Sequence, residues 1–264
     1  MKSGDPVATL VMPFGGHCGY GKIAIDSLIR WTENPMALIL LVEPIVSDED
    51  RAWAMSVPDI WPGPCTIIEN EERRGFYGGS NYGTQLAETE RVIIWVNDEV
   101  ASPGWDVPYL EAFAENRIVT GRLVEPGSIL IADPVIWKNF GYGPEDWNEA
   151  SWLAFCKAYT PEKKYDVPRQ FQPIGYHKSD FERWGTFDSG KDTMSLHTYR
   201  EDLYFFLRCY DAGAELVEVQ ECLTYHFQED ETFWSGLARE FDELDLPLGV
   251  EMVASPYQGV CVSL

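Results

Sequence analysis

Short apolar runs that alternate with helical patterns are the feature of the first hundred residues that most constrains the fold. Four runs have the length of a buried strand: residues 7–12, 37–42, 65–68 and 91–96. A helical pattern follows the first run at residues 23–31, and a Gly-rich stretch with a short predicted helix at residues 84–90 precedes the last. Strands that alternate with helices indicate βαβ units. The sequence therefore predicts an α/β fold in which a mostly parallel, Rossmann-type central sheet is flanked by helices.

Polar residues directly follow each of these predicted strands. They are residues 13–16, Glu43, residues 70–75 and residues 97–99. In open α/β sheets, ligands bind beyond the carboxyl ends of the strands. We therefore expect a ligand site at this edge of the sheet, whatever family the chain belongs to.

The second half of the chain is aromatic. Residues 136–184 contain Trp137, Trp147, Trp152 and Trp184, which form either an ordinary core or a wall on which a sugar or another flat acceptor stacks. A helix is predicted from Tyr199 to just before Gly213, and a strand at residues 215–219 leads to His226.

The domain organisation follows from the absence of any linker rich in Pro, Gly or Ser. We expect one domain over residues 1–264. It would comprise a first part with alternating strands and helices (1–100), a second part rich in aromatic residues (101–228) and an acidic C-terminal segment (229–264).

The charge excludes one class of partner. Forty-three acidic residues against twenty basic ones give a net charge of -23, which repels phosphate backbones, so we expect no binding to nucleic acid. No apolar run is long enough to span a bilayer. The six cysteines show no regular spacing, which is typical of reduced thiols. A cytoplasmic protein without a membrane span is the expectation.

Three motifs carry chemistry, and each has a structural alternative. Asn97-Asp98-Glu99 could hold Mg²⁺ or Mn²⁺, or be an acidic turn. Glu201-Asp202 could supply a general base, or Asp202 could only cap its helix. His226 could be a metal ligand or a packed, hydrogen-bonded side chain. The nucleophile elbow GxSxG and the P-loop are both missing from the sequence.

Five segments, taken in order, carry a resemblance to a known family. The first is the strand with its Pro-containing loop (7–16), and the second is Asn70-Glu71-Glu72-Arg73-Arg74-Gly75 followed by Gly79-Ser80-Asn81-Tyr82-Gly83. The third is the strand and acidic turn 91–100 with Pro103-Gly104-Trp105. The fourth is the stretch 175–188, which ends in Gly185-Thr186-Phe187-Asp188, and the fifth is Glu201-Asp202 with Arg208 and Gly213. In this order they resemble the motifs of family 2 glycosyltransferases, over roughly residues 7–228.

The resemblance implies a GT-A fold and an inverting transfer from a UDP-, dTDP- or GDP-linked sugar to a hydroxyl of a glycan or small molecule. The donor would contact Pro13, Phe14, Gly15, Glu43, Arg74, Gly75, Asn81, Asn97 and Asp98. Glu99, Asp98 and His226 would hold Mn²⁺ or Mg²⁺ on the diphosphate, Asp202 would be the catalytic base with Glu201 beside it, and Trp105, Tyr176, His177 and Trp184 would contact the acceptor.

The sequence departs from the family pattern at three places. Glu43 replaces the usual Asp, Arg73 replaces the second Asn of the Asn-rich motif, and Asn97-Asp98-Glu99 stands where the family has DXD. Two other functions stay open: a nucleotide-sugar-binding module of the same fold without catalysis, and an unrelated α/β nucleotidyltransferase.

Overall fold

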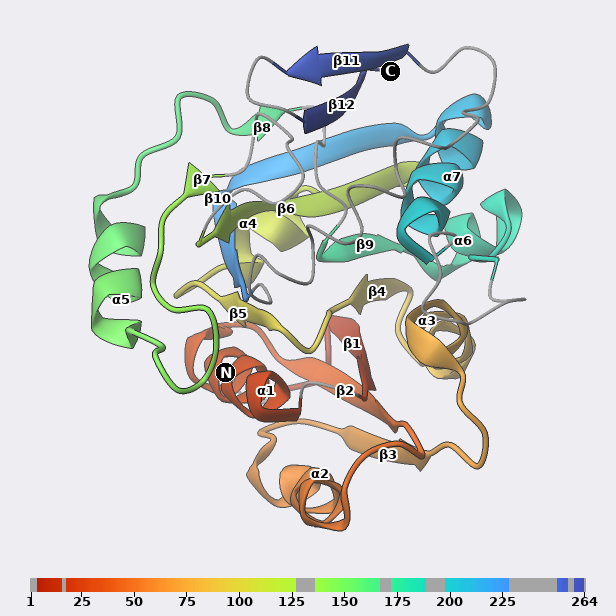
Figure 1. Cartoon of the computed structure of the whole chain (residues 1–264). Coiled ribbons are helices and arrows are strands. Elements are labelled where there is room, and N and C mark those ends of the chain that lie inside the picture. The colour runs from red at the N-terminus through yellow and green to blue at the C-terminus, as the bar shows by residue number, and fades with distance from the viewer. Residues whose placement is uncertain are drawn as a thin grey trace.

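A ten-stranded mixed sheet forms the centre of the molecule in the computed structural model (Figure 1). The structure describes residues 4–15, 18–126, 136–166, 172–188, 198–227, 251–255 and 259–263, with the backbone alone for residues 198–203, 251–255 and 259–263. The sheet has the strand order β3-β2-β1-β4-β9-β6-β10-β5, and β7 and β8 pair with β6 and β10.

The strands of this sheet have the following bounds: β1 Ala8–Phe14, β2 Met36–Val42, β3 Cys65–Glu69, β4 Arg91–Ile94, β5 Glu99–Ala101, β6 Arg117–Glu125, β7 Ile136–Trp137, β8 Tyr165–Asp166, β9 Ile174–His177 and β10 Glu215–His226. A separate pair consists of β11 Glu251–Ser255 and β12 Gly259–Ser263. The helices are α1 Cys18–Trp31, α2 Asp48–Ile60, α3 Gly75–Leu86, α4 Asp106–Glu111, α5 Glu149–Ala158, α6 Lys178–Trp184 and α7 Thr198–Asp211.

The direction of the strands creates two chemically different edges. β1, β2, β3 and β4 are parallel to one another, while β9 is antiparallel to both β4 and β6. β6 therefore runs in the direction of β4, and β10 is parallel to β6. β7 is also parallel to β6. Seven strands consequently end at the same edge, which we call the carboxyl edge; the opposite one is the amino edge.

The predicted strands of the first half are confirmed, with shifts of one or two residues at their ends. The sheet is parallel there but mixed beyond β4, because β9 and β5 run in the opposite direction. The sequence analysis did not predict α2, although Ser47 caps it and three acidic residues fill its first turn.

The Gly-rich stretch before β4 is a helix and not a loop, which corrects the prediction of a short helix at residues 84–90. Its glycines allow α3 to pack closely on β1. A Cβ atom on Gly83 would lie 2.2 Å from Val11 Cγ1, and one on Gly79 would lie 3.1 Å from Pro13 Cγ. The glycines weaken the local helical pattern, but contacts with the sheet stabilise the helix.

Two apolar layers cover the sheet. Side chains of α1, α2 and α4 pack on one face with Leu10 and Leu40, while α3, α6 and α7 pack on the other with Val11 and Leu41. Of the four tryptophans at residues 136–184, Trp152 is completely buried. Within the described residues, no helix is long and apolar enough to cross a membrane.

β10 contains an irregularity that affects the carboxyl edge. Val219 pairs with Gly121, but the next pair along the two strands is Leu223 with Arg122. Residues 220–222 thus oppose no residue of β6, and this bulge lies between the amino-edge half of β10 and His226 at its end.

Candidate functional site

The carboxyl edge brings together residues that lie far apart in the sequence. Glu43 follows β2, Asn70 follows β3, and Asn97 and Asp98 follow β4. His226 ends β10 and pairs with Glu99 at the start of the antiparallel strand β5. The expected ligand site at this edge thus has the polar side chains predicted for it, contributed by separate strands.

Glu43 organises the loop before α3. Its side chain is buried, and its Oε1 accepts a hydrogen bond of 2.9 Å from Asn70 Nδ2, while its Oε2 accepts one of 3.0 Å from the backbone N–H of Arg74. A Cβ atom on Gly15 would lie 2.8 Å from Glu43 Cγ, so the close approach requires glycine. Both carboxylate oxygens therefore accept hydrogen bonds from the protein itself, and the direct role of Glu43 is to position this loop.

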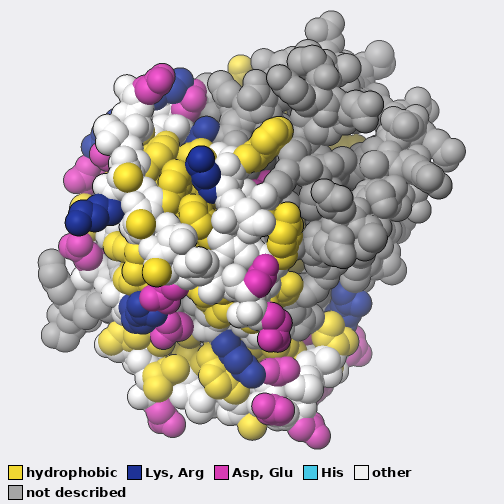
Figure 2. All heavy atoms as spheres, turned by 60° about the vertical axis from the view of Figure 1, so that its left-hand side comes forward, with side chains coloured by type: hydrophobic (Ala, Val, Ile, Leu, Met, Phe, Trp, Pro, Cys, Tyr) yellow, Lys and Arg dark blue, Asp and Glu magenta, His cyan; other side chains and the backbone are white. Residues whose placement is uncertain are grey.

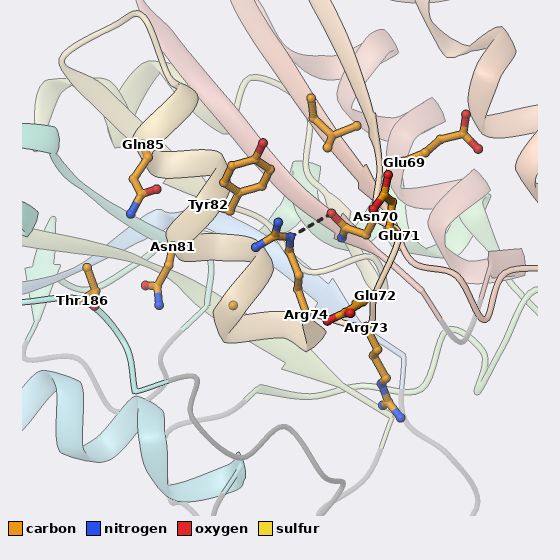
Figure 3. Close-up of a pocket in the computed structure, with 12 residues that line it drawn as sticks. Glu69, Asn70, Glu71, Glu72, Arg73, Arg74, Asn81, Tyr82, Gln85 and Thr186 are labelled. Carbon is orange, nitrogen blue, oxygen red and sulfur yellow. Dashed lines mark hydrogen bonds between the residues drawn. The ribbon is translucent and has the colours of Figure 1, made fainter.

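A cleft of about 770 Å³ opens beside this loop (Figure 3). Arg74 points into it from the start of α3; its guanidinium lies 4.2 Å from the ring centre of Tyr82, and its Nε donates to Asn70 Oδ1 at 3.1 Å. In the described part of the chain its two terminal nitrogens have no hydrogen-bond partner. The arrangement presents a fixed cation with donors available to an anionic ligand.

Asn97 connects the loop after β1 to the acidic turn. Its Nδ2 donates a hydrogen bond of 3.1 Å to the backbone oxygen of Gly15. This contact holds the turn that carries Asp98 against the end of β1.

His226 lies between two carboxylates. Its Nδ1 is 2.9 Å from Glu125 Oε1, and its Nε2 is 3.5 Å from Asp98 Oδ2. Burial disfavours the charged imidazolium, but the two carboxylates outweigh this effect and raise the pKa of His226 well above its ordinary value. The side chains of His226 and Asp98 are 26% and 27% exposed, so solvent or a ligand reaches this pair.

Glu125 is the member of this cluster that sequence reasoning missed. It ends β6, a strand that the sequence analysis did not predict. The alternating apolar run before it and the Pro126-Gly127 turn after it were the signals available in the sequence.

Glu99, expected as the principal metal ligand, has a different position. Its side chain is only 1% exposed, and its backbone oxygen accepts a hydrogen bond from Trp95 Nε1. Its carboxylate lies close enough to Tyr109 and Cys222 to add to the rise that burial causes in the pKa of both groups. Of the two neighbouring residues Asp98 and Glu99, it is Asp98 whose carboxylate faces His226.

The side chains at the carboxyl edge can be tested for whether they could bind a cation. The described residues contain no group of three His, Cys, Asp or Glu side chains arranged to hold a metal. Asp98 Oδ2 and His226 Nε2 are nevertheless separated by 3.5 Å, and two ligands about 2.0–2.2 Å from one ion lie at comparable distances from each other. Asp98 and His226 fit as two protein ligands for a cation that replaces the proton on His226 Nε2, with Glu125 on the other ring nitrogen to orient the imidazole.

Two residues expected to line the nucleobase pocket are core residues. Phe14 is completely buried and stacks on Trp53, with 5.7 Å between ring centres. Pro13 is buried against Gly79 of α3. Neither side chain presents a surface to a ligand, which corrects the expectation for both.

Two other expected donor contacts belong to α3. Gly75 begins this helix with φ = +63°, a backbone conformation that favours glycine. The side chain of Asn81 forms two hydrogen bonds with the backbone of Phe187: its Nδ2 donates to the carbonyl oxygen, and its Oδ1 accepts from the N–H. Asn81 lines the cleft, but its hydrogen bonds connect α3 to the chain after α6.

The four residues expected to contact the acceptor do not lie together at the carboxyl edge. Trp105 and Tyr176 are completely buried and form hydrogen bonds to Thr32 and Thr84. His177 lies at the amino edge, where it pairs with Arg91 at the start of β4. Trp184 is almost fully buried, and its Nε1 is 3.3 Å from Asn116 Oδ1, also near the amino edge. These four residues pack in the interior or lie at the opposite edge, so the structure does not bring together the side chains that were expected to contact the acceptor.

Glu201 and Asp202 lie in the first turns of α7, and their side chains lie outside the described part of the chain. α7 ends at Asp211, shortly before β10 begins at the amino edge. The roles of base and helix cap for Asp202 both stay open.

The comparisons with known proteins show the fold. No protein-family model matches the sequence, and no curated protein is similar to it. The structure is similar to that of GalNAc-T7, crystallised with UDP, GalNAc and Mn²⁺, with a TM-score of 0.61 and 14% sequence identity. The match covers 84% of this chain and 44% of that one, so the chain spans less than half the length of that structure. The GT-A-like fold class expected from the sequence is confirmed.

Proposed function

We propose that this protein is a glycosyltransferase that moves a sugar from a nucleoside-diphosphate sugar to an acceptor hydroxyl with inversion. The observation that carries the proposal is the pairing of Asp98 with His226 at the carboxyl edge of a GT-A-like sheet. The similar structure of GalNAc-T7 contains UDP and Mn²⁺, and the present chain offers a nitrogen–oxygen ligand pair for such an ion.

A diphosphate needs positive charge in a chain with a net charge of -23. Arg74 supplies one cation, fixed by Asn70 and stacked on Tyr82. Its planar guanidinium suits an anionic oxygen pair. We assign Arg74, together with Asn97 and the Gly15 backbone that Asn97 holds, to donor binding.

A divalent cation supplies the second charge in this proposal. Asp98 and His226 would hold it, and Glu125 would fix the imidazole through Nδ1. When bound, Mn²⁺ or Mg²⁺ neutralises the charge that develops on the leaving diphosphate.

Asp202 is the proposed base. It lies near the start of the helix α7. A carboxylate there can accept the proton of the attacking hydroxyl, and attack opposite the leaving diphosphate inverts the anomeric carbon. UDP-, dTDP- and GDP-sugars are the donor candidates, and a glycan or small molecule is the acceptor.

A panel of UDP-, dTDP- and GDP-sugars with Mn²⁺ or Mg²⁺, scored by released nucleoside diphosphate, tests the proposal. We expect release with one base, and more of it when an acceptor is present. Binding of a nucleotide sugar without turnover would instead indicate a non-catalytic module. Consumption of a nucleoside triphosphate with release of pyrophosphate would indicate a nucleotidyltransferase and contradict the proposal.

A further inference from the structure

Two large aromatic side chains are exposed beside the candidate site without a part in it. Trp137 is 48% exposed and Tyr142 is 43% exposed, whereas Phe140 and Trp152 of the neighbouring aromatic cluster are buried. Figure 2 shows the side of the molecule that carries α5 and the chain before it, where hydrophobic side chains are exposed among charged ones. Core packing accounts for the buried aromatic side chains, but it does not account for Trp137 and Tyr142.

Trp137 has a fixed position relative to His226. It belongs to β7, which pairs with the end of β6 so that Trp137 lies opposite Glu125. The N–H of Lys138 donates to the backbone oxygen of Glu125 at 2.9 Å. Since the Glu125 side chain contacts His226, one residue connects Trp137 to the proposed cation ligand.

Tyr142 is fixed by its own loop, residues 138–148. Its N–H and that of Gly143 donate to the carboxylate of Asp146 at 2.9–3.1 Å. The hydroxyl of Tyr225, the residue next to His226, donates to the backbone oxygen of Gly141. The loop is therefore preorganised and attached to β10 beside the site, which lowers the entropy lost when a ligand binds.

We propose that Trp137 and Tyr142 form an acceptor subsite for a neutral oligosaccharide. This inference rests on the proposed function, whose acceptor it specifies. The C–H face of a sugar ring is apolar and packs on an aromatic face. Glu145 and Asp146 lie exposed on the same loop, whose one basic residue is Lys138, so an anionic chain is disfavoured by like charge. An exposed aromatic pair beside acidic side chains fits an uncharged sugar.

Titration of the full chain with cellohexaose, chitohexaose and mannohexaose, followed by calorimetry, tests the subsite. We expect at least one of them to bind. Trp137→Ala and Tyr142→Ala should each weaken that binding about tenfold, while Trp137→Phe and Tyr142→Phe should keep most of it. In a transfer assay, the alanine variants should raise the acceptor KM and leave the donor KM unchanged.

Tyr210→Ala is the matched control, because Tyr210 is 56% exposed but lies at the end of α7 near the amino edge. Its oligosaccharide binding should equal that of the wild type. The proposed subsite is contradicted if none of the three sugars binds, or if the alanine variants bind them like the wild type. Tighter binding of an anionic hyaluronan hexasaccharide, or binding of an alkyl glycoside alone, would also contradict it.

A parallel thermal-shift measurement with UDP, GDP and dTDP separates the two proposals. A shift with a nucleotide but no effect of Trp137 and Tyr142 removes the subsite and leaves the proposed function. Oligosaccharide binding that depends on both aromatics, without any nucleotide shift or sugar transfer, keeps the subsite and removes the proposed function.

Discussion

The two edges of the sheet both carry a histidine and carboxylates, but they use them differently. At the amino edge, the buried Asp180 accepts hydrogen bonds from the N–H of Asn116 and from Arg183. His177 lies there with its ring stacked on Phe113. Each of these groups completes a loop, a helix end or an aromatic stack, so this edge holds the fold together.

At the carboxyl edge, two carboxylates instead face one partly exposed histidine. Asp98 follows β4 and Glu125 ends β6, and neither caps a helix. Charged groups arranged in this way shift the pKa of His226, which is typical of functional sites. The comparison teaches that residue type alone does not reveal a structural role here: His177 packs on Phe113, whereas His226 lies partly exposed between two carboxylates.

The largest expected effect is that of Asp202→Asn. Asparagine also caps helices well, so the free energy of unfolding should change little. If Asp202 is the base, sugar transfer at saturating donor and acceptor should fall by about 10²–10⁴-fold, while donor binding persists. Transfer rates and a urea titration measure the two quantities. A rate equal to that of the wild type would leave Asp202 as a helix cap only.

Asp98→Asn and His226→Gln test the carboxyl edge directly. In the wild type, a nucleoside diphosphate with Mn²⁺ at one hundred times its Kd should stabilise the fold by about 2.7 kcal/mol, which raises Tm by several degrees. Both variants should lose most of this gain, because each removes a proposed cation ligand. Asp59→Asn, on the exposed end of α2, should keep it. An undiminished shift in both variants would exclude the pair from nucleotide binding.

Asp180→Asn should show the opposite pattern at the amino edge. The substitution weakens the ion pair with Arg183, which we expect to cost about 1–3 kcal/mol of unfolding free energy. The nucleotide-dependent shift and the transfer rate should equal those of the wild type. A loss of activity without a loss of stability would break the distinction between the edges.

His177→Gln should have the smallest effect. The ring contact with Phe113 is worth about 0.5–1 kcal/mol, and the residue lies at the edge opposite Asp98. Acceptor KM and donor KM should both stay at their wild-type values. An increased acceptor KM in this variant would restore the acceptor role that the sequence first indicated.

Much of the structure of the first hundred residues could be predicted from the sequence because the elements there follow simple local patterns. β1 and β2 are continuous apolar runs, and the polar residues after them identify the ligand edge without further information. The same reasoning identified Asn97 and Asp98, which directly follow β4. His226 ends β10, seven residues beyond the strand predicted at residues 215–219, and was a candidate only through the resemblance to the glycosyltransferase family.

Which aromatic residues are buried and which are exposed could not be predicted, because an aromatic sequence does not reveal burial. Trp105 and Tyr176 form hydrogen bonds in the interior, whereas Trp137 and Tyr142 are exposed, and the two pairs look alike in the sequence. Glu99 and Asp98 are adjacent, and only the pairing of β5 with β10 determines which carboxylate turns inward. These distinctions depend on tertiary contacts that no local pattern encodes.

The bulge in β10 makes the length of one strand a determinant of the site. Side chains alternate between the two faces of a sheet, so a strand one residue shorter at residues 220–222 would exchange the faces taken by Tyr225 and His226. The tyrosine that holds the 138–148 loop and the histidine that meets Asp98 would then point the wrong way together. A single deletion in this segment would dismantle the site, although every side chain of the site would remain in the chain.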